Sequence, residues 1–222
     1  MGPVSFDFSY TLQAMPRLLD GALLTLLLAS AAILLSLILA TALTILRETG
    51  SRAARVAINI YISYIRGTPL LVQIFLIFYV LPVVGIDLGP LAAGIIALGM
   101  NSAAFTTEIM RGGLSAIPAE QIEAGRSLGL RPFAIWRKVI LPQLFRLIIP
   151  PLVNELTGVV KGTPLVSVIT VVELMRTAQQ IYNVNFRPAE VLLGAAILYF
   201  AMNFALTRMA AVIERRNALM AH

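Results

Sequence analysis

Five long apolar stretches separated by polar segments dominate the pattern of hydrophobic and polar residues along the chain. A helix needs about 20 apolar residues to cross the hydrocarbon core of a bilayer, and each stretch reaches that length. The pattern predicts an all-α integral membrane protein with five transmembrane helices in one domain, residues 1–222. The expected spans are residues 20–46, 56–81, 91–111, 144–170 and 191–213. The preceding segment, residues 5–19, mixes aromatic and polar residues and is expected to form a short interfacial helix.

The longest polar interruption, residues 112–142, is predicted to form two short helices. Pro118 suits the first turn of a helix, where a missing N–H is tolerated, and Gly129 can adopt the left-handed conformation that ends one. Pro132 then begins a second helix. The apolar stripe expected on that helix consists of Phe133, Trp136 and Ile140.

Composition supports a membrane protein. The 222 residues are 59% hydrophobic and 13% charged, with a mean hydropathy of +0.87. A soluble domain is about 45–50% apolar and about 25% charged. The net charge of +6 does not by itself indicate nucleic acid, because the placement of charge matters more than its sum in a membrane protein.

Several kinds of chemistry are excluded by the residues present. The chain contains no cysteine, and its one histidine is the terminal His222. A disulfide framework and a histidine-based metal or catalytic site are therefore not expected. The sequence also lacks the P-loop pattern G-x-x-x-x-G-K-[ST] and any visible catalytic set, so we expect neither ATP hydrolysis by that device nor a membrane enzyme.

Basic residues predict the orientation of the chain in the membrane. Cytoplasmic segments are enriched in Lys and Arg, and here these residues gather after the first, third and fifth spans. The N-terminus is therefore expected outside, and the C-terminus and residues 112–142 in the cytoplasm. The basic residues on that side are Arg47, Arg52, Arg55, Arg111, Arg126, Arg131, Arg137, Lys138, Arg146, Arg208, Arg215 and Arg216.

An internal correspondence links the second and fourth spans. Residues 59–74 and 154–169, offset by 95 positions, share an asparagine, a basic residue, the run Gly-Thr-Pro-Leu and an isoleucine. Proline disfavours helix in the residue before it, and glycine adds backbone freedom, so each Gly-Thr-Pro is expected to break or kink its span. Interrupted spans at corresponding positions indicate a transporter's substrate site near the bilayer midplane.

The candidate substrate-binding residues lie around these interruptions. A charge within a span is expensive and usually faces a polar cavity or a partner. We interpret Glu155 as a contact for a substrate amine, with a structural ion pair to Arg66 or Lys161 as the alternative. Asn101 is expected to bridge helices instead. The full candidate set is Glu155, Lys161, Gly67, Thr68, Thr163 and Asn154, although a threonine more often bonds its own helix backbone.

The polar interruption also carries a family resemblance. Glu123-Ala124-Gly125, three residues, Gly129, nine residues and then Val139-Ile140-Leu141-Pro142 resembles the EAA loop of ABC importer permeases. Gly125 replaces the second alanine of that pattern and Val139 replaces an isoleucine. In the family this loop is the coupling helix that docks into the cytoplasmic ATPase. The resemblance implies coupling roles for Gln121, Glu123, Ala124, Arg126 and Gly129.

Other segments resemble the polar amino acid (histidine, glutamine and arginine type) branch of type I importers over residues 18–215. They read R-G-T-P-L-L-V-Q, F-T-T-E-I-M-R-G-G-L, P-P-L-V-N-E and K-G-T-P-L-V-S-V-I. The resemblance implies a permease subunit in a bacterial inner membrane, paired with an identical or homologous permease. Its partners are an ATPase dimer that binds ATP and magnesium, and an external solute-binding protein. Gly162, Pro164 and Glu120 depart from the common pattern and leave the substrate open.

The expected function is import of a polar amino acid by alternating access, without covalent catalysis and without a cofactor in this chain. The connection 174–188 is expected to help receive the binding protein. An ion-coupled secondary transporter is the alternative, because such proteins also use broken helices; an assembly scaffold would not explain charges within spans. Glu155 favours a cationic or zwitterionic substrate over an anionic one.

Overall fold

The computed structural model describes residues 6–219, with side chains described through residue 209 and at Ala211. Every regular element in that range is helical. The α-helices are α1 (Phe8–Thr49), α2 (Arg52–Gly67), α3 (Leu70–Phe75), α4 (Pro90–Ser115), α5 (Ala119–Ser127), α6 (Pro132–Ile135), α7 (Leu141–Gly162), α8 (Leu174–Asn185) and α9 (Pro188–Leu219). Two π-helical turns, η1 (Leu76–Val80) and η3 (Trp136–Ile140), and two 3₁₀ turns, η2 (Leu81–Val84) and η4 (Thr163–Ile169), join them.

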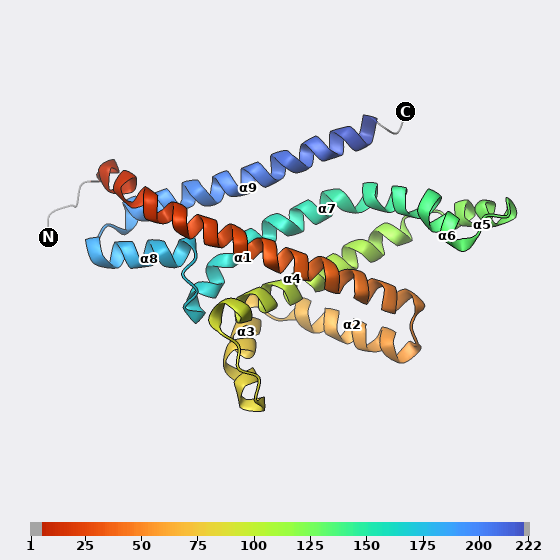
Figure 1. The fold of residues 1–222 in the computed structure, drawn as a ribbon, viewed down its shortest axis with the longest axis horizontal. Helices are drawn as coiled ribbons and strands as arrows, with labels where there is room; N and C mark the ends of the chain where they lie inside the picture. The colour runs from red at the N-terminus through yellow and green to blue at the C-terminus, as the bar shows by residue number, and fades with distance from the viewer. Residues whose placement is uncertain (1–5, 220–222) are drawn as a thin grey trace.

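The number of apolar spans agrees with the sequence pattern, although the helices of the first and fourth spans begin earlier than predicted, at Phe8 and Pro132. Four stretches are long and apolar enough to cross a membrane, and the bent pair Arg52–Gly67 and Leu70–Val84 is the fifth candidate. In Figure 1, α1, α4 and α9 run in one direction, whereas α2 and α7 run in the other. The N-terminus and α8 lie at one end of the molecule, and the C-terminus, α5 and α6 lie at the opposite end (Figure 1).

Small residues bring α1 and α4 together at the centre of the fold. Ala32 on α1 and Ala93 and Ala97 on α4 are fully buried in the main apolar cluster. A Cβ added at Gly99 would lie 2.7 Å from Leu35 Cδ2, so this approach requires glycine. Small residues on transmembrane helices allow such close packing. These small residues thus form the contact between α1 and α4.

The separate interfacial helix expected over residues 5–19 is wrong, because α1 continues without interruption through Pro16. Asp7 caps this helix by accepting from the Ser9 N–H at 2.9 Å, and that bond holds the pKa of the Asp7 carboxyl below its usual range. Thr11 and Leu18 are buried, and the Thr11 hydroxyl donates to the Glu190 carbonyl on α9 at 2.8 Å. Packing against α8 and α9 supports the helical conformation of this segment.

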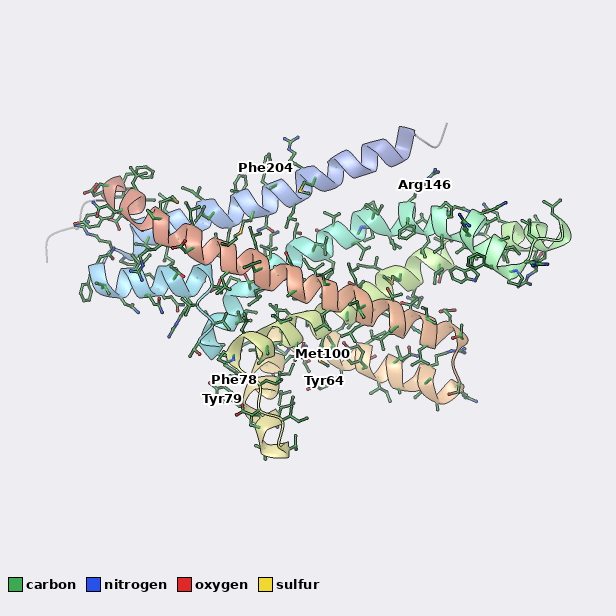
Figure 2. The ribbon with its side chains drawn as sticks, viewed as in Figure 1. Tyr64, Phe78, Tyr79, Met100, Arg146 and Phe204 are labelled. Atoms are coloured by element: carbon green, nitrogen blue, oxygen red, sulfur yellow. The ribbon has the colours of Figure 1, made fainter. Side chains whose placement is uncertain are left out.

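The first Gly-Thr-Pro breaks its span as predicted. Thr68 is extended, with φ −120° and ψ 144°, and the chain turns by 111° between α2 and Leu70–Val84. The segment after the break projects away from the other helices (Figure 1), and Figure 2 shows Phe78 and Tyr79 along it. On the other side of the break, the Tyr61 hydroxyl of α2 donates to the Met100 carbonyl of α4 at 2.6 Å.

The second Gly-Thr-Pro changes the winding of its helix but produces no comparable bend. Thr163 keeps helical angles, with φ −57° and ψ −34°, and the chain continues from α7 into the 3₁₀ turn η4. Residues 132–169 accordingly form one candidate span. The prediction that each Gly-Thr-Pro breaks or kinks its span is therefore wrong for the second one. Thr170 ends the turn in the left-handed region, with φ 69°.

The polar segment 112–142 contains one separate short helix, α5, and the turn after it is left-handed at Gly129, with φ 74°. The second short helix that the sequence predicts is not separate, because α6 continues through η3 into α7. The apolar stripe expected on the second helix is only partly correct. Ile135 and Ile140 are buried, whereas Phe133 is 75% exposed and Trp136 is also exposed. Trp136–Ile140 is a π-helical turn in which the Leu141 N–H donates to the Trp136 carbonyl. The wider turn adds one residue between inward-facing positions, so residues five apart share the buried face.

The polar connection after the fourth span folds as the amphipathic helix α8. Glu173 caps it by accepting from the backbone N–H groups of Met175 at 3.0 Å and Arg176 at 2.8 Å. Its fully buried carboxylate also accepts from the Tyr199 hydroxyl on α9 at 2.6 Å. Burial raises the pKa of the Glu173 carboxyl above its usual range, although these hydrogen bonds oppose the rise.

Candidate functional site

A polar cavity of about 530 Å³ lies where the end of α2 meets the C-terminal half of α4 and the middle of α7. Charged and amide side chains from three helices converge there. Its lining residues are Arg66, Phe105, Glu108, Ile109, Arg111, Pro151, Asn154 and Glu155. A concave site with a few convergent polar groups is typical of a small-molecule binding site.

Glu108 is the centre of a charge network at one side of this cavity. Its carboxylate accepts from the Arg111 guanidinium at 2.9 to 3.1 Å and from Arg47 of α1 at 2.5 Å. Arg66 lies farther away, with its Nη1 atom 3.9 Å from Glu108 Oε2. The Arg66 side chain is 49% exposed and its guanidinium also faces the Phe105 ring, 5.6 Å from the centroid. Glu108 thus neutralises the charges of Arg47 and Arg111 through close ion pairs. Its contact with Arg66 is longer and weaker.

Glu155 lies at the other side of the cavity, without a cationic partner among the described residues. The ion pair with Arg66 or Lys161 that the sequence leaves open is therefore not formed. The Ser102 hydroxyl of α4 is the hydrogen-bonding neighbour of this carboxyl. Ser102 in turn accepts from the Ser36 hydroxyl at 3.1 Å, and Ser36 also lies 3.3 Å from the Thr106 hydroxyl. This buried hydroxyl chain holds the acidic side chain toward the cavity.

The structure places the other predicted substrate contacts differently. Asn154 lines the cavity beside Glu155, whereas Lys161 is exposed outside it. Gly67 is exposed directly before the break. The Thr163 hydroxyl is fully buried and donates to the Val160 carbonyl at 2.8 Å. Two of the six predicted residues, Asn154 and Glu155, therefore share one cavity.

The Thr68 hydroxyl is occupied by its own chain. It donates to the Tyr64 carbonyl at 2.8 Å and accepts from the Gln73 amide at 2.9 Å. The more common role of a threonine, bonding its helix backbone, thus applies at both interruptions. The expectation that Asn101 bridges helices is confirmed, since its amide donates to Gln73 Oε1 at 3.0 Å.

Sequence reasoning did not place Phe105, Glu108 or Arg111 at the substrate site. Of the two charged residues, Arg111 was expected among the cytoplasmic basic residues, and no role was predicted for Glu108. The usable signal was their spacing: an acid and a base three residues apart face the same side of a helix. Which other helices reach that side depends on packing.

The residues with a predicted coupling role lie at the end of the molecule that also carries the C-terminus (Figure 1). Glu123, Ala124 and Arg126 are exposed on α5, and Gly129 is exposed just after it. Gln121 is exposed too, and its Oε1 accepts from the Gln143 amide at 2.6 Å, which connects α5 to α7. A Cβ at Gly125 would approach Ile135 Cγ1 to 3.3 Å, so this buried position suits a very small residue.

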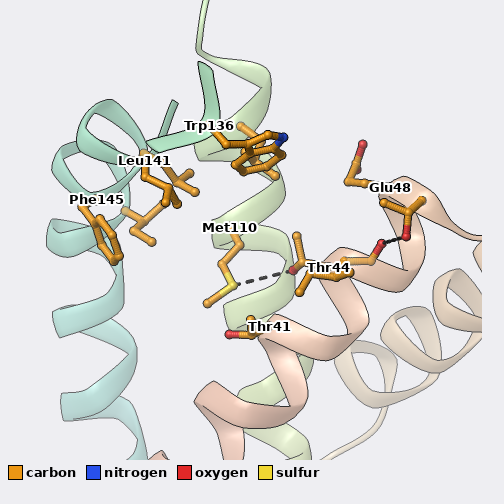
Figure 3. Close-up of a pocket in the computed structure, with 12 residues that line it drawn as sticks. Thr41, Thr44, Glu48, Met110, Trp136, Leu141 and Phe145 are labelled. Atoms are coloured by element: carbon orange, nitrogen blue, oxygen red, sulfur yellow. Dashed lines mark hydrogen bonds between the residues drawn. The ribbon is translucent and has the colours of Figure 1, made fainter. Parts of the chain in front are cut away.

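An apolar cavity of about 510 Å³ lies nearby, between the last turns of α1 and α4 and the start of α7. Figure 3 shows Trp136, Leu141 and Phe145 on one side and Thr41, Thr44 and Glu48 on the other. The Thr44 hydroxyl is 3.6 Å from Met110 Sδ (Figure 3). The two cavities differ in chemistry: one is apolar, and the other presents both signs of charge.

Comparisons with known proteins agree with this architecture. Residues 32–218 match the family described as "Binding-protein-dependent transport system inner membrane component". The chain is 39% identical to the L-cystine transport system permease protein TcyB of Bacillus subtilis (strain 168), over 90% of this chain and 86% of that protein. It is 32% identical to the arginine transport system permease protein ArtQ of the same organism, over 96% of this chain and 98% of that protein.

A solved structure is also similar. It is titled "Crystal structure of an amino acid ABC transporter with histidines" and is 33% identical to this chain, with a TM-score of 0.89. The match covers 96% of this chain and 100% of that one.

Proposed function

The chain belongs to the family of inner-membrane components of binding-protein-dependent transport systems, and we propose that it imports a polar amino acid by alternating access. It is the permease subunit of an amino-acid ABC transporter and spans the membrane several times. The ion-coupled secondary transporter is thereby ruled out. The homologues are permeases whose ATP is hydrolysed by separate subunits, so ATP and magnesium belong to the partner ATPase in this proposal.

The observation that carries the substrate class is the pairing of a loosely held arginine with an unpaired acid in one cavity. An amino acid presents a carboxylate and an ammonium group. In our proposal Arg66 receives the carboxylate, because its guanidinium is half-exposed and 3.9 Å from Glu108. Glu155 receives an amine, because no cation among the described residues neutralises it. Asn154 offers a neutral amide beside them.

The remaining predicted substrate contacts are assigned a supporting role. Thr68 and Thr163 are engaged with backbone carbonyls, and Gly67 lies next to Arg66 at the break. Lys161 points outside the cavity in this conformation.

The distribution of charge supports the proposed orientation, and the EAA-like motif supports the proposed ATPase contact. The end of the molecule with α5 and the C-terminus carries most of the basic residues, which favours the cytoplasmic side of a bacterial inner membrane. We therefore assign α5 as the coupling helix, with Glu123, Ala124 and Arg126 facing the ATPase. The solute-binding protein docks at the opposite end, near α8, and a second permease subunit, identical or homologous, completes the pathway.

The test is reconstitution of the chain with its candidate ATPase and binding protein in liposomes, with ATP hydrolysis measured as amino acids are added. Stimulation by an amino acid that is lost in Glu123→Lys is the expected result. Glu48→Lys is the matched control, because it makes the same charge change at the same end of the molecule on an exposed residue outside α5. Normal ATPase assembly in Glu123→Lys would refute the coupling role.

A further inference from the structure

Pro69 leaves one backbone carbonyl at the end of α2 without its helical partner. In an α-helix the carbonyl of residue 65 accepts from the N–H of residue 69, and proline has no N–H. The side chain of Gln73 replaces that donor: its Nε2 atom lies 2.8 Å from the Ile65 carbonyl oxygen. An unpaired carbonyl within a membrane protein costs free energy, so this side chain compensates directly for the proline.

Gln73 is fully engaged in the gap between α2 and α3. Its amide nitrogen also lies 3.1 Å from the Thr68 carbonyl oxygen and 2.9 Å from the Thr68 hydroxyl. Its Oε1 accepts from Asn101 Nδ2 of α4 at 3.0 Å, and the side chain is only 4% exposed. Gln73 lies just after the break, on α3. Its buried amide thus hydrogen-bonds both the chain before the break and the helix α4.

The second Gly-Thr-Pro supplies an internal comparison. Pro164 frees the Val160 carbonyl in the same way, but there the hydroxyl and the backbone N–H of Thr163 both donate to it. The chain then continues as a 3₁₀ turn. The residue at the position of Gln73 is Val168, which has no amide and is exposed. The interruption with the glutamine is bent by 111°, whereas the one without it belongs to a single span.

We propose that Gln73, together with Asn101, is a positioning residue that holds the bend between α2 and Leu70–Val84 and thereby sets the place of Arg66 in the polar cavity. Arg66 lies on the last turn of α2, between the Ile65 carbonyl and Thr68, which both bond Gln73. The same amide is tied to α4, the helix that carries Phe105 and Glu108. The part concerning Arg66 rests on the proposed function; the part concerning the bend does not.

The bend is measured as the distance between two spin labels, each attached to an introduced cysteine. Because the sequence contains no cysteine of its own, the labels react only at the two chosen positions. Labels are placed at Ser63 and Val83, which are exposed on the two arms of the bend, in chain diluted with unlabelled chain in liposomes. One narrow distance distribution is expected. Gln73→Leu is expected to shift or broaden it, because the Ile65 carbonyl and Asn101 lose their partner.

Two further variants make this result decisive. Asn101→Ala keeps the bonds from Gln73 to α2 and is expected to broaden the distribution less, and it serves as the test if Gln73→Leu does not fold. Gln143→Leu is the control, since it also removes an amide that bonds a backbone carbonyl, but at the other end of the molecule. An unchanged distribution in the folded Gln73 and Asn101 variants would overturn the proposal.

The link to Arg66 is tested by equilibrium binding of L-cystine, L-arginine and L-histidine to the purified complex. For whichever amino acid binds the wild-type complex, Gln73→Leu is expected to weaken binding about tenfold, the size expected for losing a hydrogen bond to a charged group. Equal affinity despite an altered bend would overturn the role in positioning Arg66. If none of the three binds the wild type, the substrate class of the proposed function fails, and the distance measurement still decides the bend.

Discussion

The guanidinium of Arg66 lies 3.9 Å from the Glu108 carboxylate, whereas Arg111 bonds the same carboxylate at 2.9 Å. Glu108 therefore balances several guanidinium groups and leaves one of them exposed enough to accept a ligand. The two distances separate a close ion pair from a longer contact, and this is the basis for proposing Arg66 as the residue that receives the substrate carboxylate.

Replacing Glu108 should destabilise the protein. Glu108→Gln leaves Arg47 and Arg111 without a counter-charge where all three side chains are partly buried. Losing hydrogen bonds to charged groups costs about 1.5–3 kcal/mol. A lower thermal unfolding temperature in detergent is expected. Glu120→Gln, on an exposed residue near the same end, is the control, and an equal effect in the two variants would contradict the role of Glu108.

Glu155→Gln should weaken substrate binding without unfolding the protein. The carboxyl lines the cavity with the Ser102 hydroxyl as its neighbour, and an amide of the same shape keeps that hydrogen bond. Loss of a charge-assisted bond to a substrate amine predicts about a tenfold or larger loss of affinity. Binding of amino acids to the purified complex measures this. Asp87→Asn, on an exposed loop residue, should bind normally, and equal losses in the two variants would exclude Glu155 as a substrate contact.

Two adjacent glycines at the end of α4 should respond oppositely to alanine. A Cβ at Gly113 would lie 2.5 Å from Ile148 Cγ2 and 2.9 Å from Leu144 Cδ1, so Gly113→Ala should destabilise by about 1–3 kcal/mol through overpacking against α7. A Cβ at Gly112 would have no neighbour within 4 Å, so Gly112→Ala should stabilise by about 0.5–1 kcal/mol. Thermal unfolding of the two variants tests the pair. Equal shifts of the unfolding temperature in the two variants would show that α7 does not pack against α4 at Gly113.

Glu173 should make stability depend on pH. Its pKa in the folded state is raised above the usual value of 4.5, so the folded protein binds more protons than the unfolded chain over the interval between those two pKa values. This contribution to the unfolding free energy is fully present below pH 4.5 and is lost as the pH rises through that interval. Glu173→Gln cannot titrate and should flatten the dependence.

The comparison of wild type with Glu173→Gln isolates this group, because Asp7 and the other carboxyls titrate in both. Unfolding temperatures across mildly acid to neutral pH provide the measurement. Tyr199→Phe removes the hydroxyl that donates to Glu173 at 2.6 Å, so it should destabilise more at neutral pH than at acid pH. A pH dependence as steep in Glu173→Gln as in wild type would contradict the assignment.

The sequence by itself determined the membrane class, the spans and the family. Runs of apolar residues long enough to cross a bilayer do not depend on tertiary contacts, and neither do the turn at Gly129 and the loss of a helical N–H donor at Pro69, which follow from local backbone chemistry. The motif around Glu123 and the Gly-Thr-Pro segments identified the type of transporter for the same reason, since they are contiguous in the chain.

Only the tertiary structure decided which of these residues act together. Arg66, Glu108 and Glu155 are distant in sequence, and their common cavity results from the crossing of α2, α4 and α7. Two identical Gly-Thr-Pro runs behave differently because Gln73 meets Asn101 at one of them, whereas Thr163 satisfies the freed carbonyl at the other. Local sequence sets where a helix is weakened; the partners available to the freed backbone groups decide whether it bends.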